Sequence, residues 1–320
     1  MEAQRLTYNK WLVVGRAGLD LYATPPGSRV EDAETFFPAL GGSAANISVG
    51  IAALGGYVAL VTTLSDDAVG RFTMNELRRY GVATDHVQFV GGEARTSLAV
   101  VATRNDDTQT VIYRNGAADF QFGAPSVDAV EFAAYGALIV TGTGLAAEPS
   151  RSATFLAADR ARAAGATVIF DVDYRAYSWD SVVASGDACR GLAALSDIIV
   201  GNEEEYAMMA GAGDGENLAR AMAEEAQAVI YKMGQRGARA FSGGRVMEFG
   251  VYPVTPLKPT GAGDAFMAGF ATGLAHGMAL EDCIRRGSAA AAIVVTRVGC
   301  APAMPNMCEL ESFLARESIS

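Results

Sequence analysis

Small residues stand beside a carboxylate in the stretch LKPTGAGDAF, residues 257–266. Gly261, Ala262 and Gly263 precede Asp264, and an apolar run with helical spacing follows. The first amides of a helix have no partner within it and carry partial positive charge, and small residues let an anion approach them closely. A carboxylate at that place can take a proton from an attacking hydroxyl while the amides hold a transferring phosphoryl group. The stretch predicts an anion site with a base, although a glycine-rich helix start explains it equally well.

A second glycine-rich stretch, GGSAAN at 41–46, also leads into a predicted helix. Gly42 permits close approach of a ligand, and Asn46 offers both a donor and an acceptor. Many loops before helices look like this, so the stretch alone is a weak signal. The chain has no GxxxxGK[ST] motif, and a P-loop is therefore not its phosphate-binding element.

Apolar, β-rich runs alternate along the chain with alanine-rich stretches of helical spacing. Continuous apolar strands separated by helices predict an α/β fold, a doubly wound and mostly parallel sheet flanked by helices. Ligands bind such sheets beyond the carboxyl ends of the strands. The predicted strands are 11–15, 57–64, 137–142, 166–173, 197–202 and 228–234, and the predicted helices include 44–54, 69–80, 150–164 and 216–226.

Two segments depart from this alternation. Residues 20–40 are loop-like, and residues 95–115 resemble two strands around the polar turn RNDDTQ, which predicts a hairpin. We expect these two segments to form a small projecting β-sheet that acts as a lid. Because no repeat or linker interrupts the chain, we expect residues 1–320 to form a single domain that includes this lid.

Composition excludes several classes of function. The net charge of −11 argues against a nucleic-acid partner. No apolar run is long enough to span a membrane and no leader-like segment opens the chain, so we expect a cytoplasmic protein without a membrane partner. The four cysteines lack CxxC spacing, and the two histidines lie far apart, which leaves little material for a zinc site or a Ser-His triad.

Four motifs in order resemble the PfkB, or ribokinase-like, family of carbohydrate kinases over essentially the whole chain. The first is Gly41-Gly42 with Asn46, and the last is Thr260 to Asp264. Between them, NEEE at 202–205 is similar to the family's NxxE motif, and KMGQRG at 232–237 is similar to its nucleotide-side strand and turn. Each motif alone is weak evidence for the family, whereas all four in the right order are specific for it.

The resemblance implies ATP-dependent phosphorylation of a sugar-type hydroxyl with Mg²⁺ as cofactor. By position Asp264 resembles the base, although a helix N-terminus favours the ionised carboxylate and should weaken it as a base. Phosphoryl transfer tolerates this, because its transition state is loose. The resemblance implies that Gly261, Ala262 and Gly263 form an anion hole, and that ATP contacts Lys232, Gly234, Gly237, Thr260, Gly261 and Gly263. It also implies that Asn202 and Glu205 reach Mg²⁺ through water and that Asp20, Gly42 and Asn46 contact the sugar. Members of the family often form a homodimer through the lid, so we expect one here. Taken alone, NEEE is better explained as a solvated acidic helix start.

Three arginines suggest an acidic substrate. Arg175, Arg16 and Arg114, in that order of preference, fall where the sheet and lid would place a ligand, and arginine binds carboxylates in a bidentate manner. The strings GRAGLDLY, DVDYRAYSW and LKPTGAGDAF resemble a subgroup that phosphorylates the 6-hydroxyl of 5-dehydro-2-deoxygluconate in inositol catabolism. Kinases of 2-keto-3-deoxygluconate or of fructose remain alternatives, as do a nucleoside kinase with Phe36 and Phe37 near the base and a non-catalytic sugar-acid sensor.

Lys258 departs from the family pattern. Most relatives carry Asp-Thr where this chain has Lys258-Pro259, and in cation-activated relatives that Asp helps to bind a monovalent ion. An ammonium group has only donors and cannot be a cation ligand. We therefore expect that K⁺ is not required because Lys258 supplies the charge, or that Lys258 faces solvent or an acidic neighbour.

Overall fold

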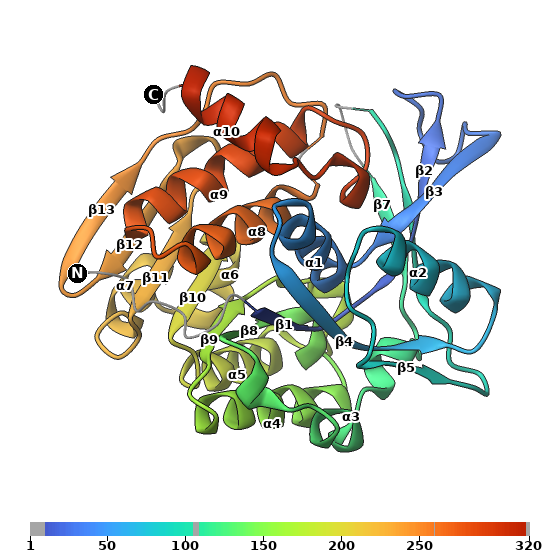
Figure 1. Ribbon diagram of the computed structural model, residues 1–320, viewed down its shortest axis with the longest axis horizontal. Coiled ribbons are helices and arrows are strands. Elements are labelled where there is room, and N and C mark those ends of the chain that lie inside the picture. The colour runs from blue at the N-terminus through green and yellow to red at the C-terminus, as the bar shows by residue number, and fades with distance from the viewer. Residues whose placement is uncertain (1–9, 105–108, 259, 318–320) are drawn as a thin grey trace.

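The computed structural model describes residues 10–104, 109–258 and 260–317. A nine-stranded sheet lies at its centre, in the order β13-β12-β11-β10-β9-β8-β1-β4-β5 (Figure 1). The strands run parallel except for β12, which pairs antiparallel with both β11 and the edge strand β13. The bounds are β1 Lys10–Val14, β4 Tyr57–Ser65, β5 Val87–Val90, β8 Ala137–Thr141, β9 Thr167–Asp171, β10 Ile198–Asn202, β11 Ala228–Lys232, β12 Ala238–Ser242 and β13 Arg245–Phe249.

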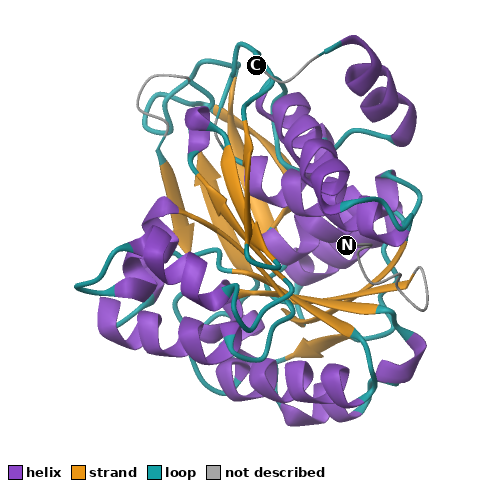
Figure 2. Ribbon diagram, turned by 90° about the vertical axis from the view of Figure 1, so that its left-hand side faces the viewer, coloured by secondary structure: helices purple, strands orange, loops and turns teal. Residues whose placement is uncertain are grey.

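Helices cover both faces of this sheet, as the doubly wound prediction requires (Figure 2). The helices α1, α8 and α9 lie over one face and α3, α4 and α5 over the other (Figure 1). The bounds are α1 Ser43–Ala53, α2 Ala68–Arg79, α3 Ala124–Asp128, α4 Ser150–Ala163, α5 Val182–Ala193, α6 Glu203–Ala210, α7 Gly215–Met222, α8 Ala262–Ala275, α9 Leu280–Val295 and α10 Met307–Arg316. No helix within the described ranges is long and apolar enough to cross a bilayer.

Alternation along the strands divides the core in two. In β1 the side chains of Trp11 and Val13 enter one apolar cluster, and those of Leu12 and Val14 enter the other. Successive side chains of a strand point to opposite faces, so a strand covered on both sides must be apolar throughout. This is why the six continuous apolar runs were recognisable as strands from the sequence.

The edge strands were missed by the sequence prediction. β5 is short and its burial is incomplete, whereas β12 and β13 carry charged residues such as Arg239 and Glu248. These two side chains lie opposite each other on neighbouring strands and form a salt bridge. Strands at a sheet edge tolerate polar residues, so the apolar signal that marks central strands is absent there.

A second, four-stranded sheet projects from the body in the order β3-β2-β6-β7, with bounds β2 Gly18–Thr24, β3 Thr35–Gly41, β6 Ser97–Val101 and β7 Thr110–Tyr113 (Figure 1). The predicted hairpin is confirmed, because β6 and β7 pair antiparallel, although its turn at 105–108 lies outside the described residues. The loop-like interpretation of 20–40 was wrong at both ends, where β2 and β3 lie. Pro38 obscured β3, and a proline is tolerated there because β3 is an edge strand.

Candidate active site

Polar side chains gather at the carboxyl ends of the central strands. Asp171 ends β9, where its Cα pairs with that of Thr141 in β8 and of Val200 in β10. Asn202 and Lys232 pair with each other at the ends of β10 and β11. The strand order reverses between β1 and β8, because β4 follows β1 on one side of the sheet and β9 follows β8 on the other. Ligands bind doubly wound sheets at such a switch point.

The helix α8 begins at this edge with its first amides uncapped. Gly261 is its N-cap residue in a left-handed conformation, φ 84°, which favours glycine. Among the described residues, the N-cap of α8 makes no side-chain cap hydrogen bond. By contrast, Asp67, Ser181 and Asn202 cap their own helices. The free amides of α8 are therefore available to an anion.

Asp264 is the third residue of α8 and is partly buried. Its Oδ2 accepts a 2.8 Å hydrogen bond from Nδ2 of Asn46, in the first turn of α1. Burial raises the pKa of Asp264 to about 6, and the negative charge of Asp173 adds to this, while Asn46, Arg175 and Arg16 act in the opposite direction. Burial therefore acts against the effect that we expected from the helix terminus, which favours the ionised carboxylate.

Two lysines flank the start of α8. A Cβ built on Gly263 would lie 3.7 Å from Nζ of Lys232, which is itself 3.8 Å from Oδ1 of Asp171. Lys258 is 7% exposed, and its ammonium donates to the carbonyl of Thr260. Burial lowers the pKa of Lys258, although Cys300, Asp264 and Asp20 favour its charged form. A solvent-facing Lys258 is thus excluded, and it forms no salt bridge with any described residue.

The predicted sugar-side residues come together around the N-terminus of α1. Gly42 is the N-cap residue of α1, with φ 96° and no side-chain cap. A Cβ on Gly41 would lie 1.9 Å from Oδ1 of Asp20, so only glycine leaves room for this buried carboxylate. Oδ1 of Asp20 and Oδ1 of Asn46 are buried without a hydrogen-bond partner in the described part of the chain. Unpartnered buried acceptors are rare and mark a place where a ligand donor fits.

The three arginines differ in their partners. Arg114 is buried, forms a salt bridge with Asp119 and also donates to the carbonyl of Thr143, 2.9 Å away. Arg175 lies 2.6 Å from Oδ1 of Asp173, and this carboxylate raises its pKa. Arg16 donates to Oγ of Ser97 at 3.1 Å and has no salt bridge within the described ranges. Arg16 is therefore the arginine with most capacity for an additional carboxylate.

The predicted metal residues form a capping box. Oδ1 of Asn202 accepts from the amide of Glu205 at 3.0 Å, and Oε2 of Glu205 accepts from the amide of Asn202 at 2.6 Å. Glu205 is buried and also accepts from the amide of Tyr174, so its carboxylate organises the backbone around the strand ends. Among the described residues no group of three His, Cys, Asp or Glu side chains could hold a metal ion.

The glycines of the KMGQRG turn are required by the backbone. Gly234 and Gly237 have φ values of 59° and 86°. A Cβ on Gly237 would lie 1.8 Å from the carbonyl oxygen of Phe249, so the turn packs closely against the end of β13. This explains the glycines by local geometry and leaves their contact with a nucleotide as a prediction.

Asp173 was missed by the sequence analysis. It has a φ of 37°, the only positive value among the described non-glycine residues, and its Oδ2 is buried without a partner. Strained backbone of this kind clusters at functional sites. The signal was present in DVDYR, where two acids alternate at the end of an apolar strand.

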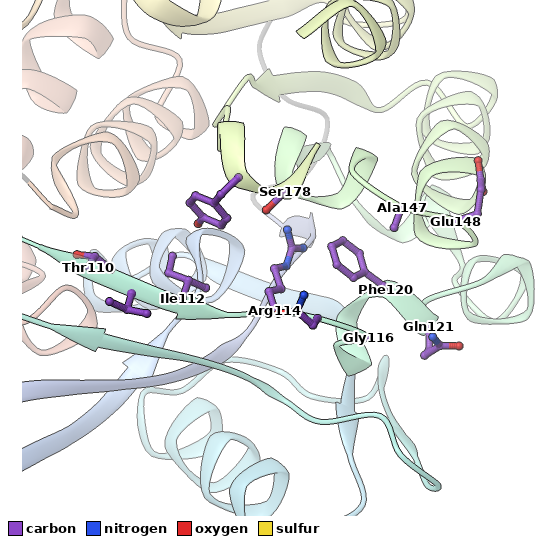
Figure 3. A pocket seen from close by; sticks show the side chains of 12 residues that line it. Thr110, Ile112, Arg114, Gly116, Phe120, Gln121, Ala147, Glu148 and Ser178 are labelled. Carbon is purple, nitrogen blue, oxygen red and sulfur yellow. The ribbon is translucent and has the colours of Figure 1, made fainter. Parts of the chain in front are cut away.

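A pocket of about 680 Å³ opens beside this site (Figure 3). Arg114 and Phe120 lie together in its wall, and the Arg114 guanidinium is 4.1 Å from the centre of the Phe120 ring. Thr110 and Ile112 of β7 line the small-sheet side. Tyr177, also in the wall, interacts electrostatically with Arg16, Arg175 and Arg114, which joins the pocket to the strand ends.

Comparison with known proteins identifies sugar kinases. The pfkB family carbohydrate kinase profile matches residues 9–307. A 5-dehydro-2-deoxygluconokinase of Photobacterium profundum is 37% identical over 310 residues, which cover 95% of this chain and 94% of that protein. One of Geobacillus kaustophilus is 34% identical over 311 residues, with 95% and 93% covered.

Solved structures show the same architecture. The fructokinase of Xylella fastidiosa, determined with bound ATP, superposes with a TM-score of 0.85 at 26% identity and covers 96% of this chain and 98% of its own. A PfkB protein of Polaromonas sp. JS666 superposes with a TM-score of 0.83 at 26% identity, with 95% and 99% covered. The predicted ribokinase-like fold is confirmed.

We expect the carboxyl group of Asp264 to titrate near pH 6, because burial and Asp173 disfavour its charge. The titration is measured by carboxyl ¹³C NMR of aspartate-labelled protein, with Asp264→Asn to assign the resonance. Asp173→Asn removes a negative neighbour and should lower the midpoint, whereas Asn46→Ala removes a donor to the carboxylate and should raise it. A midpoint near 4 in the wild type, or shifts of the same sign in both variants, would contradict this account.

Proposed function

The chain belongs to the pfkB family of carbohydrate kinases, and we propose that it transfers the γ-phosphoryl group of ATP to the 6-hydroxyl of 5-dehydro-2-deoxygluconate, a step of inositol catabolism. Relatives of that name at 33–37% identity support the substrate. The observation that carries the reaction type is Asp264, held by Asn46 at the uncapped start of α8. With ATP as the second substrate, we expect the protein to act in the cytoplasm.

In this mechanism Asp264 accepts the proton of the attacking hydroxyl. Its raised pKa suits that task, because a base is most effective when its pKa lies near the working pH. The first amides of α8, from Gly261 to Gly263, hold the oxygens of the transferring group, and Lys258 and Lys232 supply positive charge on either side. Charge stabilisation and positioning are the main contributions to phosphoryl transfer.

ATP would lie between the end of β11, which carries Lys232, and Thr260 in the turn before α8, next to Gly234 and Gly237. The buried Thr260 hydroxyl has no hydrogen-bond partner among the described residues, and it fits a phosphate oxygen. When bound, Mg²⁺ neutralises charge on the phosphates. It keeps several waters and few protein ligands, so the capping box of Asn202 and Glu205 would reach it through water.

Arg16 is our first choice for the substrate carboxylate. Its guanidinium has no carboxylate partner in the described chain, and it acts electrostatically on both Asp20 and Asp264. Arg175 is second, because it is already paired with Asp173 although 44% of its side chain is exposed. Asp20, Gly42 and Asn46 would face the sugar hydroxyls. A nucleoside site formed by Phe36 and Phe37 is disfavoured, since neighbouring strand residues point to opposite faces.

The test is a panel of 5-dehydro-2-deoxygluconate, 2-keto-3-deoxygluconate, fructose, ribose and a nucleoside with ATP, measured as ADP release. We expect the highest kcat/KM for 5-dehydro-2-deoxygluconate. Arg16→Gln should lower kcat/KM for the acids about 10- to 100-fold, because a charged hydrogen bond contributes about 1.5–3 kcal/mol. The loss for fructose should be much smaller, since only the effect of Arg16 on Asp20 and Asp264 is then removed.

Asp264→Asn is the control for contaminating kinases, and its kcat should fall at least about 100-fold with the KM for ATP kept. Exposed Arg71→Gln is the matched arginine control and should behave as wild type. Higher kcat/KM for fructose or ribose than for every acid would refute the acid assignment. Sugar-acid binding without ADP release would favour a sensor.

We further propose that Lys258 takes the place of an activating cation. The ammonium is buried next to Thr260, and its charge acts on both Asp264 and Asp20. The wild-type rate should change less than about twofold when potassium is replaced by tetramethylammonium at constant ionic strength. Lys258→Met should lower kcat about 100-fold or more, the size of effect seen when a charge-stabilising group is removed. Strong activation of the wild type by K⁺ would refute this role.

We propose that the small sheet acts as a lid and also joins two copies of the chain. Its outward face is apolar, because the register places Leu21, Val100 and Val111 in one row and Leu98 beside Tyr113 in the next. Val111 and Tyr113 are 45% and 59% exposed. Contiguous exposed apolar side chains of this kind mark protein interfaces.

Sedimentation should therefore give twice the chain mass of 33.3 kDa at micromolar concentration. Tyr113→Asp should produce a monomer, since it places a charge in the apolar face. Phe89→Asp is the matched control, because Phe89 is similarly exposed but lies on β5 of the large sheet. A wild-type monomer, or a dimer unaffected by Tyr113→Asp, would contradict the proposal.

A further inference from the structure

Tyr22 joins the small sheet to the segment behind the start of α8. It lies in β2 two residues after Asp20, so both side chains point to the same face. Its hydroxyl is 3.0 Å from Oδ2 of Asp20 and 3.3 Å from Sγ of Cys300. Tyr22 is 1% exposed, and Cys300 is also buried. The three polar groups form a continuous buried chain.

The proton order in this chain follows from the groups themselves. A phenol has a single proton, and an ionised carboxylate only accepts. Burial raises the pKa of Cys300 to about 11 and raises that of Tyr22 well above its usual range, so both are protonated at neutral pH. The Tyr22 hydroxyl therefore donates to Asp20, and the Cys300 thiol can donate to the Tyr22 oxygen.

Cys300 also packs against Gly261, in the turn from Gly261 to Gly263 that is proposed to bind the phosphoryl group. A Cβ built on Gly261 would lie 3.0 Å from Sγ and 3.3 Å from Cβ of Cys300. The Tyr22 hydroxyl thus bridges the carboxylate proposed to face the sugar and the residue against which the first turn of α8 rests. A shift of β2 relative to α8 would break one of its two contacts.

Resting on the proposed sugar-binding role of Asp20, we propose that Tyr22 is a positioning residue that holds the Asp20 carboxyl group in register with the turn from Gly261 to Gly263. Its bond to Oδ2 is the one side-chain hydrogen bond that Asp20 forms among the described residues, and it leaves Oδ1 for a donor from the sugar. Sugar and phosphoryl group would then be aligned through a single buried hydroxyl.

Loss of this hydroxyl has a predictable electrostatic effect. Burial raises the pKa of Asp20, and the groups that oppose this rise are Arg16, Tyr22 and Lys258. Removing the Tyr22 donor raises the pKa of Asp20 further, so the carboxylate protonates at a higher pH. Sugar affinity should therefore be lost at a higher pH than in the wild type.

The test is Tyr22→Phe, which keeps the buried ring. We expect the KM for the sugar acid to rise about 10- to 100-fold at neutral pH and the acid limb of kcat/KM for the sugar to move to higher pH. The KM for ATP should stay within about twofold. Tyr206→Phe is the matched control, because it removes another buried hydroxyl, one that contacts only backbone carbonyls.

Variants of Cys300 test whether the buried chain of Asp20, Tyr22 and Cys300 acts as a unit. Cys300→Ala removes the donor to Tyr22 and should weaken sugar binding moderately, whereas Cys300→Ser keeps a donor and should stay near wild type. Melting temperature identifies any variant that fails to fold. If Tyr22→Phe fails, the difference in sugar KM between Cys300→Ala and Cys300→Ser tests the proposal instead. An unchanged sugar KM and pH profile in Tyr22→Phe, with an active wild type, overturns the inference. An inactive wild type, or a normal sugar KM in Asp20→Asn, overturns the proposed function instead.

Discussion

The hydrogen bond from Asn46 to Asp264 fixes the geometry on which the rest of the site depends. It joins the first turns of α1 and α8, two helices that both start at a glycine of positive φ without a side-chain cap. Their open ends meet the carboxyl edge of the sheet, where unpaired amides and strand-end side chains converge. Glycine is required at both starts because each N-cap residue has a positive φ and backbone or buried side chains close by.

Desolvation determines the chemistry of the carboxylates at this edge. Asp20, Asp171, Glu205 and Asp264 all have raised pKa values, and burial is the largest cause in each case. For Asp264 burial acts against the effect expected from the helix terminus, and the raised pKa suits its proposed role as base. The oxygens of Glu205 accept hydrogen bonds from the backbone amides of Tyr174 and Asn202, so this buried carboxyl group stabilises the loops at the strand ends.

The sequence predicted the central fold well and the edges poorly. Strands such as β1 and β10 are apolar on both faces and leave a continuous signal, whereas β12 and β13 carry charges at an exposed edge. The glycine-rich helix starts were recognisable because spacing along the chain defines them. The link between Tyr22 and Cys300 joins residues 278 positions apart, and no local pattern records it. The sequence likewise left open whether Lys258 faces solvent, because its burial depends on residues that are distant in the chain.

The balance of charge explains how an acidic chain can accept an anionic substrate pair. Arg175 is neutralised by Asp173 and Arg114 by Asp119, and Lys232 lies near Asp171. Arg16 and Lys258 form no salt bridge within the part of the chain described here. Arg16 follows β1 on the side proposed to bind the sugar, and Lys258 lies beside Thr260, just before the turn proposed to bind the phosphoryl group. The two uncompensated cations thus correspond to the two anionic ends of the proposed reactants, a sugar carboxylate and a transferring phosphoryl group, while Asp264 lies within the electrostatic reach of both.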